Sequence, residues 1–478
     1  MKKLMLFLMI SVMAFCLVAC GDDAKEETST TEAPKATEAP KTEEAATETE
    51  EEDEEPARDL GGQTIVIADW WSGNEDGDDE SGYRITDTTY QEEYWDYQDE
   101  MMEKYNYKLI RQTKSDWSNM AKDAMLTITT GEPLGDIIVL DSGSVASLLD
   151  KGMFADVSNV SDFDFTDDKW NQAVLEVMTV GDAVYGFAGS TEPRTGVFYN
   201  KELFKQAGLD ENLPYTMQAD GTWTFENFTD LCSKLCMDTD NDGTYDVYAI
   251  ASFSADFFAA ALLANGTDVI AKADDGSLMV NTSDPAVLEA LNWGRDLYDL
   301  GYHMPQPEDS EWNWFVKAFQ EGQVAMRVCE EYNVSEINQY DFDFGFVCFP
   351  QGPSADSLIS IVRENILIIP SCFDDQHISD TAFAYNIYTN DVPGYEDDDT
   401  AWKASYETLF KDEQAVSETL NNMINLLPQK MSSTILLPDY AKDWCYSIDA
   451  GSATPAEVME EYTSQWTAMV DEFNAKFN

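Results

Sequence analysis

The sequence predicts a mixed α/β fold, because short apolar runs alternate with longer amphipathic stretches. Runs such as DIIVLD suit a strand that is covered on both sides. The stretches between them carry apolar residues at spacings of three and four, which is typical of helices. This alternation indicates a parallel sheet flanked by helices. Residues 60–478 exceed what one hydrophobic core usually supports, so we expect two lobes.

The first elements of residues 60–478 follow this alternation. The stretch QTIVIADWW predicts a buried strand over 64–68, and YKLIRQT predicts the next strand. Between them we expect a helix whose apolar face carries Tyr90, Tyr94, Tyr97, Met101 and Tyr105. A second helix should end at Gly131 and bury Trp117, Met120, Ala124 and Ile128 on one face.

Two further helices are predicted from their caps. Asn200 is a good N-cap for a short helix that Gly208 should end. Thr224 should cap the helix in TWTFENFTDLCSKL, whose apolar residues recur on one inward face. The strand-like VYGF and GVFY lie upstream, with Gly and Pro between them.

The N-terminus predicts export and attachment to a membrane. Two lysines precede an apolar run from Leu4 to Ala19, and Cys20 follows. The run is shorter than the ~20 residues of a spanning helix, so residues 1–19 are predicted to be a secretory signal peptide. LVAC resembles the lipobox of bacterial lipoproteins, in which that cysteine receives acyl chains such as palmitate. The alternative is an ordinary signal peptide with a chance cysteine.

Residues 20–59 are predicted to be a disordered acidic tether. They are rich in Thr, Glu, Ala and Pro, and they contain no aromatic residue. Such a segment buries too little apolar surface to offset the entropy of ordering. Like charges and prolines should keep it extended, so that it lifts the following domain off the membrane surface.

Composition excludes some function classes. The formal net charge of -64 argues against a nucleic-acid partner, because phosphate binding needs basic clusters. The same charge favours a soluble monomer. Two histidines and the absence of a CxxC argue against a zinc site. Apart from Cys16 and Cys20, six cysteines remain, and they either pair or stay as buried thiols.

Five stretches in order resemble the extracellular solute-binding proteins of ABC importers, in the carbohydrate-binding group. They are TTGEPLGDIIVLD, LLDKGMFADVS, VYGFAGSTEPRTGVFYNKELFKQAGL, TWTFENFTDLCSKL and FQEGQVAMRV. The resemblance implies a two-lobed periplasmic-binding-protein-like fold with hinge strands, the first crossover lying near 186–200. It also implies capture of a solute, expected to be an oligosaccharide, by hinge closure, and delivery to permease subunits. With the lipid anchor, the protein should sit on the outer face of the cell membrane.

A sugar pocket needs aromatic rings and a few polar groups aimed at hydroxyls. Nine residues at predicted strand ends or crossovers are candidates for this role: Trp70, Trp71, Asp141, Glu192, Arg194, Glu330, Tyr332, Arg363 and Asn365. Alternatives stay open for several of them. Glu192 and Arg194 suit a hinge salt bridge equally well, and Arg363 and Asn365 suit a plain turn.

The stretch DTDNDGTYDVYA resembles a calcium-binding loop of the EF-hand type. Its oxygen ligands would come from alternate positions: Asp238, Asp240, Asp242, the carbonyl of Thr244, and Asp246. The twelfth position is Ala249 instead of the bidentate Glu, so affinity should be lower or another ligand is needed. A plain Asp/Asn/Gly turn is the alternative. Any calcium here is expected to be structural.

Two other function classes compete with uptake. A secreted glycan-acting enzyme is one, but no GxSxG, HExxH or Ser/His arrangement is present. The numerous acids form pairs by chance, so paired carboxylates do not discriminate. A solute sensor for a signalling partner is the other, and the sequence does not separate it from an uptake receptor. We therefore expect a binding protein without catalytic activity.

Overall fold

The structure is a computed structural model that describes residues 58–74, 91–189, 192–273, 275–395 and 402–477. The predicted signal peptide, Cys20 and residues 21–57 of the predicted tether lie outside these residues, as does Tyr90. Arg58, which the sequence placed in the tether, forms ion pairs with Asp162 at 2.8 Å and Asp380 at 2.9 Å. No helix among the described residues has the length and apolar character needed to cross a membrane.

One sheet of the described chain has the strand order β13-β3-β1-β2. Its strands are β1 (Gln63–Asp69), β2 (Tyr107–Thr113), β3 (Ile137–Leu140) and β13 (Ile366–Ile368). β1 is parallel to β2 and β3, as predicted, whereas β13 returns from far along the chain and is antiparallel to β3. Because β1 and β3 are parallel, Trp70 and Asp141 follow their strands at the same edge of the sheet.

The helices of the first lobe correct two sequence predictions. These helices are α2 (Gln91–Lys104), α3 (Met120–Thr130), α4 (Val145–Leu149), α5 (Gln172–Met178) and α13 (Asp375–Tyr388). In α2 the buried residues are Trp95 and Gln98 instead of the predicted tyrosine face, because Gln98 bonds to the carbonyl of Ile387 on α13. Trp117 precedes α3 and is 64% exposed, whereas the other three predicted residues are buried and Gly131 ends the helix at φ 78°.

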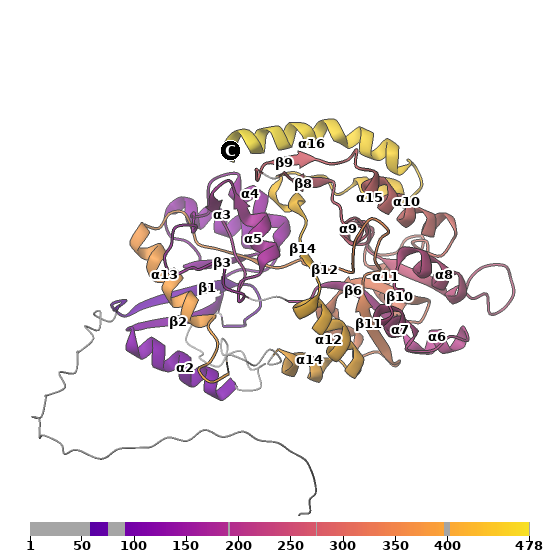
Figure 1. Ribbon diagram of the computed structural model, residues 1–478, viewed down its shortest axis with the longest axis horizontal. Helices are drawn as coiled ribbons and strands as arrows, with labels where there is room; N and C mark the ends of the chain where they lie inside the picture. Colours follow the sequence, from indigo (N-terminus) through magenta and orange to yellow (C-terminus); the bar gives the residue numbers. More distant parts are fainter. Residues whose placement is uncertain (1–57, 75–90, 190–191, 274, 396–401, 478) are drawn as a thin grey trace, which may run out of the picture. The chain divides into compact units, whose positions relative to one another are not determined.

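The second sheet has the order β14-β12-β6-β10-β7, with β11 also paired to β6 (Figure 1). Its strands are β6 (Thr195–Asn200), β7 (Tyr248–Ser252), β10 (Val324–Glu330), β11 (Phe344–Cys348), β12 (Ser360–Ile361) and β14 (Gln429–Lys430). β10 is parallel to β7 and antiparallel to β6. Two hairpins complete the described strands: β4 (Thr179–Val180) with β5 (Ala183–Val184), and β8 (Ile270–Lys272) with β9 (Leu278–Val280).

The helices that accompany the second sheet confirm the predicted caps. Asn200 Oδ1 accepts from the N–H groups of Glu202 and Leu203, and Thr224 Oγ1 accepts from the N–H of Asn227. The main helices are α6 (Lys201–Gln206), α7 (Leu213–Ala219), α8 (Phe225–Leu235), α9 (Ser254–Ala264), α10 (Pro285–Asp299) and α11 (Trp314–Gln320). The later ones are α12 (Val334–Ile337), α14 (Lys403–Leu409), α15 (Trp444–Asp449) and α16 (Pro455–Phe477). Short 3-10 and π-helical turns link them: η1 (Ser142–Ser144), η2 (Glu331–Asn333), η3 (Ala415–Leu420), η4 (Asn422–Leu426) and η5 (Ser433–Leu436).

Two short chain segments cross between the sheets, and a longer return from β13 to β14 passes through α13 and α14. The first runs from Phe187, which pairs with Leu367 of β13, to the start of β6. The second runs from β12 to β13. The N–H of Glu192 in the first crossover donates to Glu364 Oε1 in the second at 2.8 Å. The two crossovers therefore lie against each other.

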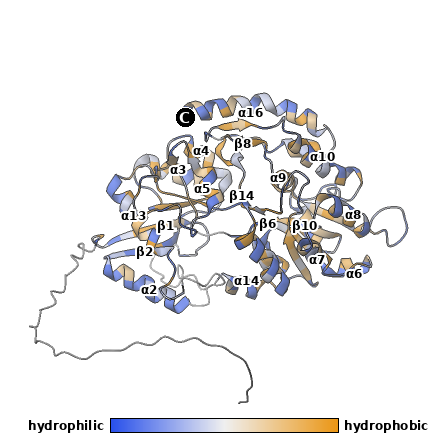
Figure 2. Cartoon of the chain, viewed as in Figure 1, coloured by the Kyte–Doolittle hydropathy of each residue, from blue (hydrophilic) through white to orange (hydrophobic). Residues whose placement is uncertain are grey.

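The core is apolar and aromatic, and the polar faces of the helices turn outward (Figure 2). Trp223 is buried and donates its indole N–H to the carbonyl of Cys348 at 2.7 Å, which ties the segment before α8 to β11. The cysteines that the structure describes are all free thiols, which settles the question that the sequence left open for these six.

Candidate functional site

A cavity of about 370 Å³ has walls from both lobes. The first lobe contributes Ser142 and Gly143 just after β3. The second lobe contributes one side of α9 along its length and a segment that leads into α15. The second crossover supplies 361–363 between them. The size lies in the range of small-molecule sites, so the cavity is the candidate binding site.

The charged wall of the cavity centres on Arg363. Its Nη1 donates to Asp256 Oδ1 at 2.6 Å and to Glu330 Oε1 at 2.8 Å. Asp141, from the first lobe, is close enough to act electrostatically on Arg363. A side chain built at Gly143 would lie 3.7 Å from Lys442 Nζ, so the two lobes approach closely here. The wall therefore offers both donors and acceptors to a polyhydroxylated solute.

Aromatic rings lie beside this charged wall. Phe253 follows β7, and its ring centroid lies 6.1 Å from that of Tyr446 and 6.3 Å from that of Trp312. Tyr446 and Trp312 are exposed, as is Tyr332, which packs over the guanidinium of Arg194 at 5.7 Å. Exposed rings next to hydrogen-bonding groups are what stacking against the C–H faces of a sugar requires.

In the first lobe, the two predicted tryptophans differ in exposure. Trp71 is 48% exposed, and Trp70, which is half-buried, packs edge-on against it at 4.8 Å. Asp69 is buried and lies 3.7 Å from Arg111 Nε. Arg111 in turn lies 5.5 Å from the Trp71 ring. Trp71 is therefore partly exposed while Trp70 and Arg111 pack against it.

Glu192 and Arg194 form an ion pair in the hinge, which is one of the two alternatives from the sequence. Arg194 lies 3.0 Å from Glu331 and 3.7 Å from Glu364, and it also pairs with Glu192. The side chains of Arg194, Glu331 and Glu364 are at most 8% exposed, whereas that of Glu192 is 49% exposed. Asn365 is half-buried beside them. We call these four charged residues the hinge cluster.

The hinge cluster holds more negative than positive charge. Burial raises the pKa of Glu364 to about 8, and the charge of Glu192 adds to this shift. Burial also raises the pKa of Glu331, against the opposing effect of Arg194. Within the part of the chain that the structure describes, Glu331 Oε2 and Arg194 Nε are buried and have no hydrogen-bond partner. One arginine does not compensate two buried carboxylates, so the cluster favours a bound proton.

Several residues at the cavity were not among the sequence candidates. Phe253 and Asp256 follow β7, so the strand-end argument that selected Trp70 would have found them. Lys442 and Tyr446 come from the C-terminal part of the chain, and no local pattern marks them. Asp268 lies on the loop between α9 and β8 and reaches the cavity only through the tertiary fold.

The predicted calcium loop brings three of its carboxylates together. Oxygens of Asp238, Asp240 and Asp246 lie within 4.8 Å of one another. Backbone bonds between Met237 and Val247 close the loop. The Asp242 carboxylate is not in this group and accepts from the N–H of Thr244 at 2.8 Å. Three of the five predicted ligands therefore converge as a cation site requires, and Asp242 and Thr244 are not part of this group.

Residues 96–371 match the family model for bacterial extracellular solute-binding proteins. Among solved structures, the cyclic α-maltosyl-1,6-maltose binding protein of Arthrobacter globiformis is similar, at 16% identity and a TM-score of 0.62, with 86% of this chain and 99% of that chain covered. UgpB of Mycobacterium tuberculosis, solved with glycerophosphocholine, is similar at 16% identity and a TM-score of 0.59, with 86% of this chain and 98% of that chain covered.

The GacH receptor of Streptomyces glaucescens, solved unliganded and with acarbose, gives 14% identity and a TM-score of 0.57, with 86% of this chain and 99% of that chain covered. These likenesses confirm the predicted two-lobed, periplasmic-binding-protein-like fold. No curated protein matches the chain in sequence.

The hinge cluster predicts how stability depends on pH. Glu364 ordinarily titrates near 4.5 and here near 8, so the folded state binds more protons between these values. The free energy of unfolding should therefore fall as pH rises from about 5 to 8. Glu364→Gln should flatten this fall and raise the melting temperature relative to wild type at pH 9. The matched control Glu202→Gln, at an exposed position, should keep the wild-type slope. Thermal unfolding across pH 5–9 measures this, and parallel slopes for both variants would contradict it.

Proposed function

We propose a function from one premise: the chain belongs to the bacterial extracellular solute-binding proteins. We propose that it captures a carbohydrate-like solute in the cavity between its lobes and delivers it to the permease of an ABC importer. The observation that carries this proposal is that two exposed rings lie close to the Arg363 wall, Tyr332 near enough to interact electrostatically with Arg363 and Tyr446 with Asp256. That combination suits a solute with hydroxyls and flat C–H faces.

Hinge closure would complete the site. The cavity takes walls from both lobes, so a solute that touches both stabilises the arrangement that brings them together. The crossovers that link the sheets provide the pivot, as hinges of a few element-terminal residues do. Trp71, on the first lobe, would then approach the solute from the side opposite Tyr332.

Binding without turnover is part of the proposal. The family is one of binding proteins. Asp256 and Glu330 are engaged in ion pairs with Arg363, so these two carboxylates are not free to act as an acid–base pair. A solute sensor would use the same cavity and differ only in the partner that reads the closed form.

The binding proposal is tested by calorimetric titration of the chain with neutral oligosaccharides. Tyr332→Ala should weaken binding about tenfold, because a stacking ring is lost from the site. Trp71→Ala should have a similar effect. The control Trp117→Ala removes an exposed tryptophan just before α3 and should leave affinity unchanged. Release of a product from any glycan, or full affinity in both test variants, would contradict the proposal.

We propose that Cys20 is lipidated and holds the protein on the outer face of the cell membrane as a monomer. The support is the apolar run that ends in LVAC, followed by an acidic segment without aromatic, Val, Ile, Leu or Met side chains. A lipid anchor with a flexible tether raises the effective concentration of the receptor at its permease while the domain reorients freely.

Cys20→Ser should move the protein from the membrane fraction to the medium of the producing bacterium, because the acylated sulfur is lost. Cys16→Ser is the matched control, since Cys16 lies inside the apolar run. That variant should stay with the membrane. Fractionation followed by immunoblotting measures this, and membrane retention of the Cys20 variant would contradict lipidation.

We also propose that the Asp238 loop binds calcium in a structural role. The support is the convergence of three carboxylates in a loop closed by backbone bonds. Asp238 Oδ2 accepts from the N–H of Gly243 at 2.9 Å, which curls the loop around its carboxylates. The ion would offset repulsion among these carboxylates and fix the connection between α8 and β7.

Calcium should raise the melting temperature, because an ion that binds only the folded state stabilises it by about 2.7 kcal/mol at 100 times its Kd. Asp240→Asn should reduce the shift strongly, since it removes one charged ligand. Asp164→Asn, at an exposed aspartate that accepts from Thr166, should leave the shift unchanged. Thermal unfolding with calcium and with a chelator measures this. Equal melting temperatures in the two conditions would remove the calcium proposal.

A further inference from the structure

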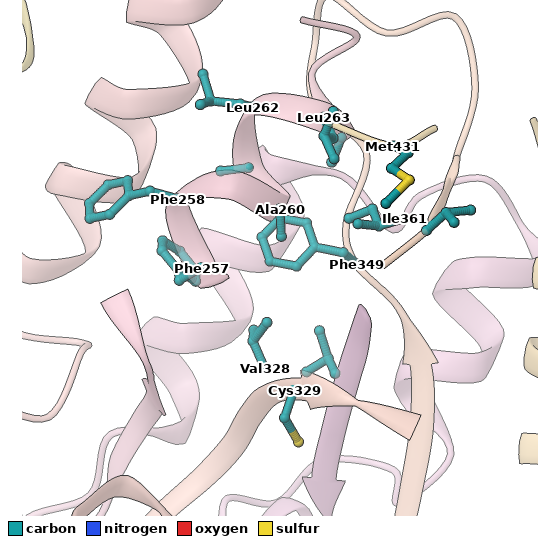
Figure 3. Close-up of a cluster of buried hydrophobic side chains, with 14 of the residues drawn as sticks. Phe257, Phe258, Ala260, Leu262, Leu263, Val328, Cys329, Phe349, Ile361 and Met431 are labelled. Carbon is teal, nitrogen blue, oxygen red and sulfur yellow. The ribbon is translucent and has the colours of Figure 1, made fainter. Parts of the chain in front are cut away.

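The cavity has two chemically different ends. One end carries Asp439 and Lys442, which are both exposed. The other is formed by buried apolar side chains, among them Leu263 and Met431 (Figure 3). Asp268 lines the cavity at this apolar end. A carboxylate in such surroundings needs a compensating partner.

Hydrogen bonds hold Asp268 in place but do not neutralise it. Ser432 Oγ donates to Asp268 Oδ2 at 2.7 Å, and the N–H of Val269 donates to Oδ1 at 2.7 Å. The backbone N–H groups of Ile270 and Ser433 also donate to this carboxylate. Among the described residues, no lysine, arginine or histidine forms an ion pair with it. Burial raises the pKa of its carboxyl to about 6, against the effect of these hydrogen bonds. Tyr440 also faces Asp268, and burial raises the pKa of that phenol, so it stays neutral.

The cations at the cavity are not available to Asp268. Arg363 is already shared between Asp256 at 2.6 Å and Glu330 at 2.8 Å. Lys442 is exposed at the other end of the cavity. At neutral pH the cavity therefore carries a carboxylate that is ionised and uncompensated. The partner that this carboxylate lacks is a cation.

The excess of carboxylate over available cations at the cavity discriminates among classes of solute. An acidic sugar would meet uncompensated carboxylates and be rejected. A neutral sugar offers Asp268 only a hydroxyl donor. A protonated amine supplies a cation and forms a charge-assisted hydrogen bond, which is stronger than a neutral one and gains further from the apolar surroundings.

We propose that the solute is a carbohydrate that carries a protonated amino group, and that Asp268 is the residue that selects it. This proposal deepens the function proposed above and rests on it. The ammonium group binds between Asp268 and the Ser432 hydroxyl at the apolar end. The sugar rings extend toward Arg363 and the rings of Phe253 and Tyr446.

The proposal predicts both a preference and a pH dependence. The full-length chain is titrated with oligosaccharides of equal length built from glucosamine, N-acetylglucosamine or galacturonic acid. At pH 7 the amine should bind at least about tenfold more tightly than its acetylated counterpart, which keeps the ring but loses the charge. The preference should shrink at pH 5, because protonation of Asp268 removes the anion. Equal or tighter binding of the acetylated or acidic series at pH 7 would overturn the proposal.

A pair of variants assigns the preference to its residue. Asp268→Asn keeps the shape of the side chain and should abolish the preference for the amine while leaving binding of neutral sugars within about twofold. Asp275→Asn is the matched control: Asp275 is exposed on the β8–β9 turn and also accepts from a serine, Ser277, at 2.6 Å. That variant should keep the wild-type preference, and a preference that survives Asp268→Asn would overturn the assignment.

The two proposals fail in distinguishable ways. If neutral sugars bind as well as the amine, the receptor function stands and only the amine proposal is overturned. If no carbohydrate binds, both proposals are overturned. Should Asp268→Asn not fold, as judged by circular dichroism, the preference and pH dependence of the wild-type chain decide the matter.

Discussion

The arrangement of the two lobes depends on the buried ion pairs of Arg194. Its guanidinium forms ion pairs with carboxylates from three segments. These are Glu192 in the first crossover, Glu331 just after β10, and Glu364 in the second crossover. Removing Arg194 would cost about 3–5 kcal/mol, because the buried carboxylates around it would stay uncompensated. These segments are therefore held as a unit about which the lobes can pivot.

The same segments connect the hinge to the cavity. In two pairs of consecutive residues, one side chain points to the hinge cluster and the other to the cavity wall. Glu331 and Glu364 reach Arg194, while their neighbours Glu330 and Arg363 form the ion pair in the cavity wall. A movement of either segment therefore changes both networks together. A solute that bonds to Arg363 acts on groups one residue away from the hinge, which links occupancy of the cavity to the position of the lobes.

Charge is distributed unevenly between these two places. In the hinge cluster the excess carboxylates are buried, and burial raises their pKa values, which favours binding of a proton. In the cavity, Asp268 is half-buried and lines a space that a solute can enter. The chain has a net charge of -64 and few cations. At the hinge a bound proton compensates the excess carboxylate, whereas in the cavity we propose that a cationic group of the solute does so.

Local patterns in the sequence determined the three parallel strands of the first sheet, the caps at Asn200 and Thr224, and the position of Trp71 after β1, because these depend on neighbouring residues. The tertiary structure alone decided which face α2 buries, since Gln98 finds its partner on a helix almost 290 residues away by sequence. It also decided that Trp117 stays exposed and that Asp256, Asp268 and Lys442 reach one cavity. Periodicity reports what one segment buries, whereas a site made from several crossings of the chain depends on contacts that no local pattern encodes.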